Sequence, residues 1–232
     1  MKVGPQPSGL LTRRKILSAA AKVFLEKGFA GASSRAVAEL AGVSNGSPFY
    51  LYGNKEGALL ELVKQMFANQ FAAAGQLTGS ADGLLLYAVK AALQIHIVEY
   101  KETLRELYVT AYTLPHIAEY IRRSMLPHIS SAFGPYLEDT SEHTLYEMAI
   151  ASSGVTRSFM AVPCSEDFPL SRKLRRYLSC CFRLYGVPAE RFEPVIEQVL
   201  QMDLRQNAIQ IVENTVRQTG EGFEAAMAEA KK

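Results

Sequence analysis

The chain has 232 residues, of which 48% are hydrophobic and 21% charged, as in an ordinary globular protein of one domain or two small ones. No apolar run approaches the roughly 20 residues that span a bilayer, and the first eleven residues lack the pattern of a secretory signal. We therefore expect a cytoplasmic protein without a membrane partner, and the three cysteines, too few for a disulfide framework, fit a reducing compartment.

The net charge of +2 is unevenly distributed along the chain. Residues 1–66 carry nine Lys or Arg and four Glu, a net charge of +5, which leaves −3 for the remainder. A basic head on a mildly acidic body is typical of a phosphate-binding module joined to a domain with another task.

Residues 1–11 contain turn formers without periodicity, so we predict a flexible arm. A first helix is predicted over residues 12–28, because Thr12 is a suitable N-cap, Gly28 a suitable C-terminal residue, and the apolar residues between them recur at helical spacing.

Residues 33–55 predict two short helices joined by a tight turn, which is the geometry of a helix-turn-helix. Ser33 can cap the first of these helices and Gly42 can end it. Ser44 can cap the second, of about two turns, in which Pro48 falls at the fourth position and removes one terminal hydrogen bond. A helix-turn-helix makes double-stranded DNA the first partner to consider.

A longer helix is predicted over 55–76, followed by a loop at 78–83. Further on, apolar spacing and Pro or Gly breaks predict helices over residues 84–99, 102–113, 116–133, 142–162, 170–185, 189–217 and 221–231. No segment alternates apolar and polar residues with period two, so the predicted fold class is all-α.

The predicted helix over 142–162 carries an apolar stripe at three-four spacing, beside small residues that permit close helix approach. The stripe either faces the protomer's own core or forms a dimer interface. Because helix-turn-helix proteins usually bind DNA as dimers, we favour an interface, with self as a partner. Its candidate residues are Leu145, Met148, Ser152, Val155 and Phe159.

The second half of the chain is rich in Tyr, Phe and Met, which fits either a plain core or an apolar pocket with a few hydroxyls for a small molecule. The candidate pocket residues are Phe67, His96, Tyr108, Tyr112, Phe133, Tyr146 and Phe159.

The sequence contains no catalytic or metal-binding constellation. Its four histidines are not paired at ligand spacing, and it has no phosphate-binding glycine loop, so we expect no enzyme, no metal and no cofactor. Cys180 and Cys181 could bind a soft metal or respond to oxidation, but a small apolar pair on a buried helix face is the simpler interpretation. A basic cluster is interpreted as a solvated face or, alternatively, as a patch for an acidic ligand: Arg172, Lys173, Arg175 and Arg176.

Residues 12–60 resemble the N-terminal signature of TetR-family transcriptional regulators. The resemblance rests on Thr12-Arg13, Phe24 to Phe29, Ser33 to Ala38, Ala41 to Ser44, Gly46, Phe49 to Tyr52, Asn54 to Glu56 and Leu59. It implies a ligand-responsive homodimeric repressor whose third helix enters the major groove of a pseudo-palindromic operator and which a small molecule releases. The implied domains are a helix-turn-helix over 12–54 and a helical ligand-binding and dimerisation domain over 55–232, with the helix at 55–76 as connector.

By position in this signature, Asn45, Ser47 and Tyr50 would meet base edges, and Ser33, Ser34, Arg35 and Lys55 would hold phosphates. Amide and hydroxyl groups suit base edges, and cations suit phosphates. Ser44, Gly46 and Phe49 complete the candidate DNA-binding set.

Three positions depart from the family pattern: Phe49 and Leu51 stand where the family has Tyr or His, and Ala32 where it has Thr. An alternative therefore stays open, namely a small-molecule-binding or interaction module with a drifted, weakly DNA-binding head.

Overall fold

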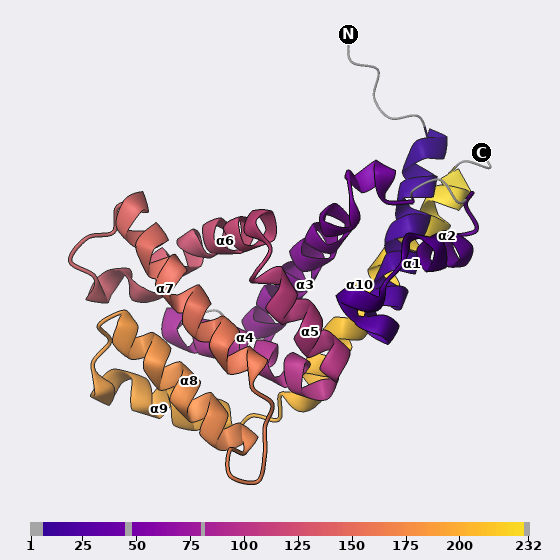
Figure 1. The fold of residues 1–232 in the computed structure, drawn as a ribbon. Helices are drawn as coiled ribbons and strands as arrows, with labels where there is room; N and C mark the ends of the chain where they lie inside the picture. The colour runs from indigo at the N-terminus through magenta and orange to yellow at the C-terminus, as the bar shows by residue number, and fades with distance from the viewer. Residues whose placement is uncertain (1–6, 45–47, 80–81, 230–232) are drawn as a thin grey trace. The chain divides into compact units, whose positions relative to one another are not determined.

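A computed structural model describes residues 7–44, 48–79 and 82–229, and every element that these residues form is helical, as the sequence predicted (Figure 1). The elements are α1 (Pro7–Gly31), α2 (Ser34–Ala41), the 3-10 helix η1 (Pro48–Tyr52), α3 (Lys55–Thr78), α4 (Gly83–Tyr100), α5 (Glu102–Ala111), α6 (Pro115–Phe133), the 3-10 helix η2 (Gly134–Tyr136), α7 (Glu142–Ala161), α8 (Leu170–Leu184), α9 (Ala189–Gln201) and α10 (Arg205–Glu229).

The chain divides into two compact units, of which unit 1 comprises Met1–Phe67 with Val212–Lys232 and unit 2 comprises Ala68–Ile211. Both boundaries fall inside helices, one in α3 and the other in α10. The domain limit predicted from sequence lies after residue 54, with the C-terminal segment in the second domain.

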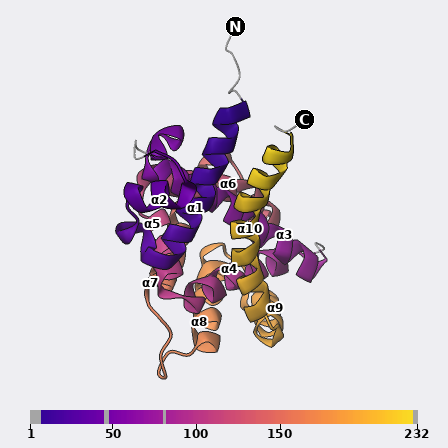
Figure 2. The same cartoon turned by 90° about the vertical axis from the view of Figure 1, so that its right-hand side faces the viewer.

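Helix α4 forms the centre of unit 2. It is buried along most of its length from Leu84 to Val98, as expected for a helix that is apolar on all sides. The helices α5, α6, α7, α8 and α9 all pack against it, and Figures 1 and 2 show it among them from two directions. Beside it the rings of Phe133 and Tyr185 stack with centroids 3.9 Å apart.

The cluster predicted as a solvated basic face is partly internal. Lys173 is fully buried, and its Nζ lies 2.6 Å from Oε1 of Glu99, whose other oxygen lies 3.2 Å from Arg105. Burial alone would raise the pKa of Glu99, but the hydrogen bond from Lys173 and the neighbouring charges lower it. The prediction of a fully solvated cluster is therefore wrong for Lys173, because its ammonium group pairs with an acid on α4.

Several helix limits differ from those predicted. Helix α1 begins at Pro7, inside the segment predicted as an arm, and includes Gly28 as a non-helical kink with φ 71°. The helix predicted over 189–217 is two helices, because Met202 is extended and Asp203 accepts a hydrogen bond from the N–H of Arg205 at 3.3 Å, which starts α10. No described helix is long and apolar enough to cross a membrane.

Candidate nucleic-acid interface

Helices α1 and α2 and η1 pack together within unit 1 and build the motif that the sequence predicted. Ser33 caps α2, since its hydroxyl accepts a hydrogen bond from the N–H of Ala36 at 3.2 Å. Gly42 ends α2 in the left-handed conformation with φ 63°, and Val43 then donates its N–H to the carbonyl of Ala38 at 3.1 Å. Both predicted caps are confirmed.

The second helix of the motif was predicted to begin after Ser44. Within the described residues it is the 3-10 helix η1 (Pro48–Tyr52), and residues 45–47 lie outside the described part. The first position of a helix tolerates proline well, because the N–H there has no intrahelical partner. The predicted base contacts of Asn45 and Ser47, and the predicted role of Gly46, thus fall on residues that the structure does not describe.

Phe49 belongs to the core of unit 1 and not to its surface. Its side chain is 2% exposed, and its ring is nearly parallel to that of Phe24, with centroids 6.5 Å apart. The prediction that Phe49 contacts DNA is therefore wrong, because burying this ring is what fixes η1 on α1. A tyrosine hydroxyl at this buried position would need a hydrogen-bond partner.

Tyr50 is the most exposed residue of η1, with 81% of its surface accessible to solvent. Tyr52, two positions on, is held instead: its hydroxyl donates to the carbonyl of Arg13 at 2.6 Å, and the Arg13 guanidinium lies 4.7 Å from the centre of its ring. Burial of Tyr52 raises the pKa of its hydroxyl, although Arg13 opposes this. Tyr50 therefore keeps the position expected of a base-reading side chain.

Lys55 has an intramolecular role that the sequence analysis missed. Its Nζ donates to the carbonyls of Phe29 at 2.7 Å and Ala32 at 3.1 Å, and it lies 4.3 Å from the centre of the Phe29 ring. The ammonium thus satisfies carbonyl groups at and just beyond the C-terminal end of α1, where a cation is favoured. The phosphate contact predicted for Lys55 stays a prediction.

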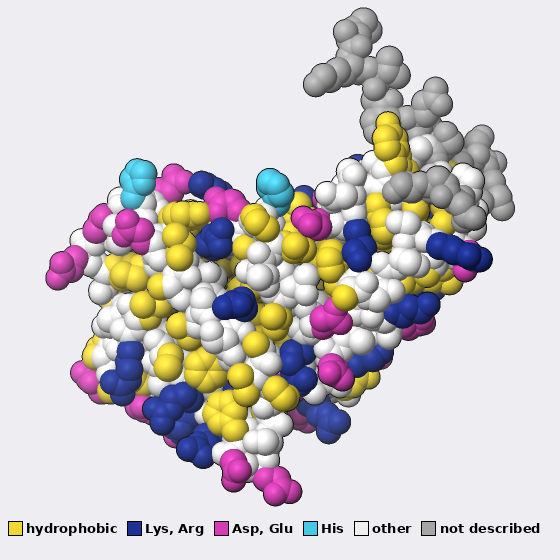
Figure 3. Space-filling view, in the orientation of Figure 1, with side chains coloured by type: hydrophobic (Ala, Val, Ile, Leu, Met, Phe, Trp, Pro, Cys, Tyr) yellow, Lys and Arg dark blue, Asp and Glu magenta, His cyan; other side chains and the backbone are white. Residues whose placement is uncertain are grey.

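The other predicted phosphate-binding residues lie on the surface. Ser33, Ser34, Arg35 and Ser44 are all exposed, and Arg35 forms an exposed ion pair with Glu39 at 3.1 Å. Arg13, which the prediction did not include among the site residues, is also exposed and lies against η1. Figure 3 shows Lys and Arg side chains spaced along unit 1, interrupted by acidic ones.

Of the seven predicted pocket residues, Tyr112 alone lines a pocket found among the described residues of unit 2. Phe133 stacks on Tyr185 in the core, Tyr108 accepts a hydrogen bond from Gln70, and Tyr146 donates to Glu119 at 2.5 Å. The remaining three have other surroundings: Phe67 is buried in unit 1, the pKa of His96 is lowered by burial, and Phe159 lies 5.5 Å from Tyr177 between ring centroids. Periodicity could not separate core from pocket, because both need apolar residues at the same spacing.

The stripe predicted as a dimer interface turns largely inward. Leu145 and Ser152 are buried within the protomer, whereas Met148, Val155 and Phe159 are half-buried. For Leu145 and Ser152 the prediction is therefore wrong, because the core of unit 2 already covers them. The outward face of α7 carries Ile150, Ala151, Gly154 and Ser158.

This arrangement, in which α1, the capped helix α2 and the short η1 pack together in a basic unit with an exposed tyrosine, defines a helix-turn-helix DNA-binding unit joined to an all-α unit. Residues 16–62, from α1 into α3, match the family model described as "Bacterial regulatory proteins, tetR family". The match supports a DNA-binding transcriptional regulator of the TetR family. A comparison with curated proteins finds no significant match.

Proposed function

We propose that the chain is a repressor that binds a pseudo-palindromic operator as a homodimer and is released when a small molecule occupies unit 2. The observation that carries the DNA-binding part is the exposed Tyr50 on a capped helix-turn-helix that matches the family model. Tyr50 reads base edges, while Arg13, Ser34 and Arg35 hold phosphates on either side.

The outward face of α7 supports the homodimer. Ile150 is 48% exposed and Val162, at the C-terminal end of the same helix, is 54% exposed. Between them Gly154 has no neighbouring atom within 4 Å of the position where a side chain would begin, so a second helix can approach closely. Figure 3 shows hydrophobic side chains distributed over the face on which α7 and α8 lie.

The continuity of α3 supports coupling between ligand and DNA. The helix starts in unit 1 directly after η1 and ends in unit 2, where its Phe71 ring lies 5.4 Å from Nζ of Lys90, a pocket residue. A ligand that shifts Lys90 and Phe71 would act on a helix that also belongs to the DNA-binding unit, which is the kind of two-state element that ligand response requires.

Fluorescence anisotropy with operator fragments tests this assignment through Tyr50. The Tyr50→Ala variant should bind its best fragment about tenfold or more weaker, with changed preference at one or two base pairs, because a base contact contributes about 1–3 kcal/mol of discrimination. Arg35→Ala is the matched control and should weaken binding to all fragments alike. If Tyr50→Ala leaves both affinity and preference unchanged, Tyr50 does not read bases.

A further inference from the structure

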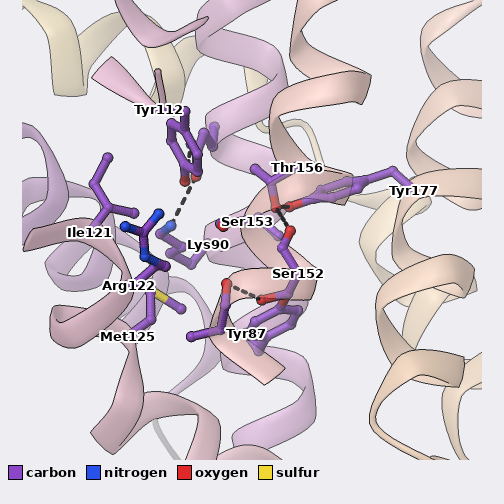
Figure 4. Close-up of a pocket in the computed structure, with 13 residues that line it drawn as sticks. Tyr87, Lys90, Tyr112, Ile121, Arg122, Met125, Ser152, Ser153, Thr156 and Tyr177 are labelled. Atoms are coloured by element: carbon purple, nitrogen blue, oxygen red, sulfur yellow. Dashed lines mark hydrogen bonds between the residues drawn. The ribbon is translucent and has the colours of Figure 1, made fainter. Parts of the chain in front are cut away.

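A pocket in unit 2 lies between α4, α6, α7 and α8 (Figure 4). The void between its side chains is about 360 Å³, part of which is open to solvent. The polar side chains that line it include Lys90, Gln94, Tyr112, Arg122, Thr156 and Tyr177.

Lys90 brings a cation into this pocket from the buried face of α4. Its side chain is 4% exposed, and Nζ donates to Oε1 of Gln94 at 2.9 Å. Gln94 in turn donates to the hydroxyl of Tyr112 at 3.0 Å, so this amide is fixed and presents only its oxygen to Lys90. Burial lowers the pKa of Lys90 to about 7, which shows how costly the charge is at this position.

Arg122 adds a second cation from α6. One of its terminal nitrogens lies 3.1 Å from Oε2 of Glu119, but its Nε is buried and has no hydrogen-bond partner among the described atoms. A buried N–H without an acceptor is unfavourable, because the donor has lost its hydrogen bonds to water. The group is therefore poised to donate to an acceptor that enters the pocket, and Figure 4 shows Arg122 and Lys90 reaching into the same space.

The rest of the lining suits an anion with an apolar body. None of the lining residues is Asp or Glu, so nothing in the wall repels a negative charge. On the other side of the pocket from Lys90 and Arg122, the hydroxyls of Thr156 and Tyr177 lie 3.0 Å apart (Figure 4). Ile121, Met125 and the tyrosine rings provide apolar and aromatic surface.

We propose that this pocket binds a small organic monocarboxylate, whose carboxylate group is held by Lys90 and Arg122 and whose apolar body lies against the tyrosine rings. The inference rests on the proposed function in one respect only, namely that this anion is the ligand that releases the repressor from DNA. Binding of the anion itself requires neither DNA nor a dimer.

Isothermal titration calorimetry of the full chain near pH 7 tests the proposal, with benzoate as the probe and benzamide and benzylamine as its neutral and cationic counterparts. Benzoate should bind at least about tenfold more tightly than benzamide, because only the carboxylate forms charge-assisted hydrogen bonds with both cations. Benzylamine should not bind. Equal affinity for benzoate and benzamide, or no binding of either, would overturn the proposal.

Two pocket variants and one control locate the site. Lys90→Met keeps the length of the side chain, and Arg122→Leu removes the unpaired donor; each should lower benzoate affinity about tenfold or more. The control is Arg123→Leu, since Arg123 also pairs with Glu119 and is adjacent in sequence but does not line the pocket. If Arg123→Leu weakens binding as much as Arg122→Leu does, general surface charge accounts for the binding and the site is refuted.

A parallel titration with operator DNA separates this inference from the function on which it rests. Benzoate binding without any specific DNA complex would leave the pocket assignment standing and refute the repressor. A specific DNA complex in a protein that does not bind benzoate would do the opposite. Release of DNA by benzoate, but not by benzamide, supports both.

Discussion

Lys55 is the residue whose role the structure changes most, because its ammonium group bonds to two carbonyls of unit 1 at 2.7 Å and 3.1 Å. The Lys55→Met variant should lower the free energy of unfolding by about 1.5–3 kcal/mol, the range for hydrogen bonds to a charged group. Urea denaturation measures this. Arg35→Met, which removes only an exposed ion pair, should change stability by no more than about 0.5 kcal/mol. If the Lys55→Met variant unfolds like the wild type but binds DNA poorly, the main role of Lys55 is a phosphate contact.

The buried ammonium of Lys90 makes a prediction about pH. Its pKa is about 7 in the folded chain and returns to an ordinary value of about 10.5 on unfolding, so above pH 7 the unfolded chain holds more protons. Stability should therefore rise with pH from about 7 to 8.5. In Lys90→Met this rise should be smaller, and the variant should be more stable than the wild type at pH 6, because an apolar side chain replaces a buried charge.

Other titrating groups near Lys90 do not account for the difference in pH dependence between the wild type and Lys90→Met. The pKa of His128 on α6 is lowered by burial and by Lys90, the pKa of Tyr112 after α5 is raised by burial, and burial raises the pKa of Cys181 on α8 to about 12. Burial raises the pKa of the lining tyrosines Tyr87 and Tyr177 well above the ordinary value, so both stay neutral in this range. Identical pH profiles of wild type and Lys90→Met, measured by thermal unfolding, would show that Lys90 does not titrate there.

Among the elements, the junction between η1 and α3 depends on one glycine. A methyl group at Gly57 would lie 1.9 Å from the carbonyl oxygen of Tyr52, so the two segments must move apart to accept it. Gly57→Ala should lower stability by about 1–3 kcal/mol, as overpacking does, and should weaken DNA binding. The control is Gly134→Ala, where a methyl group would meet only the Thr140 side chain at an ordinary 3.8 Å, so it should be close to neutral. Equal melting temperatures for wild type and Gly57→Ala would contradict this close approach.

The outward face of α7 makes a prediction about assembly. Ile150→Glu places a charge on this face without touching the core, so it should shift a dimer to monomer, because two copies would bring like charges together. Light scattering over a range of concentrations measures the mass. Tyr100→Glu is the matched control, since Tyr100 is exposed to a similar extent at the end of α4. A dimer that survives Ile150→Glu uses another surface.

The helices themselves could be predicted from sequence, because caps and apolar spacing are local signals. Ser33 and Gly42 act as predicted. The burial of Phe49 and the anchoring of Lys55 could not be predicted, because both depend on where α1 lies in space. The pocket could not be predicted for the same reason, because Lys90 and Arg122 come together only when their two helices pack in space.

On the scale of the whole molecule, the charge asymmetry of the sequence connects the fold to the function. Residues 1–66, which carry a net +5, lie in unit 1 with the helix-turn-helix, whereas unit 2 holds the pocket. A protein that binds DNA through such a basic unit releases counterions from the phosphates, so its affinity must fall as salt is added.

The most direct test of the account is a titration of DNA from the region upstream of this gene, and of a scrambled duplex of equal length, at several salt concentrations. The account predicts a specific complex with the upstream DNA, a linear decrease of log affinity with log salt, and a scrambled duplex that binds weakly with a similar salt dependence. No specific complex even at low salt would contradict DNA-dependent regulation and favour a binding module with a drifted head.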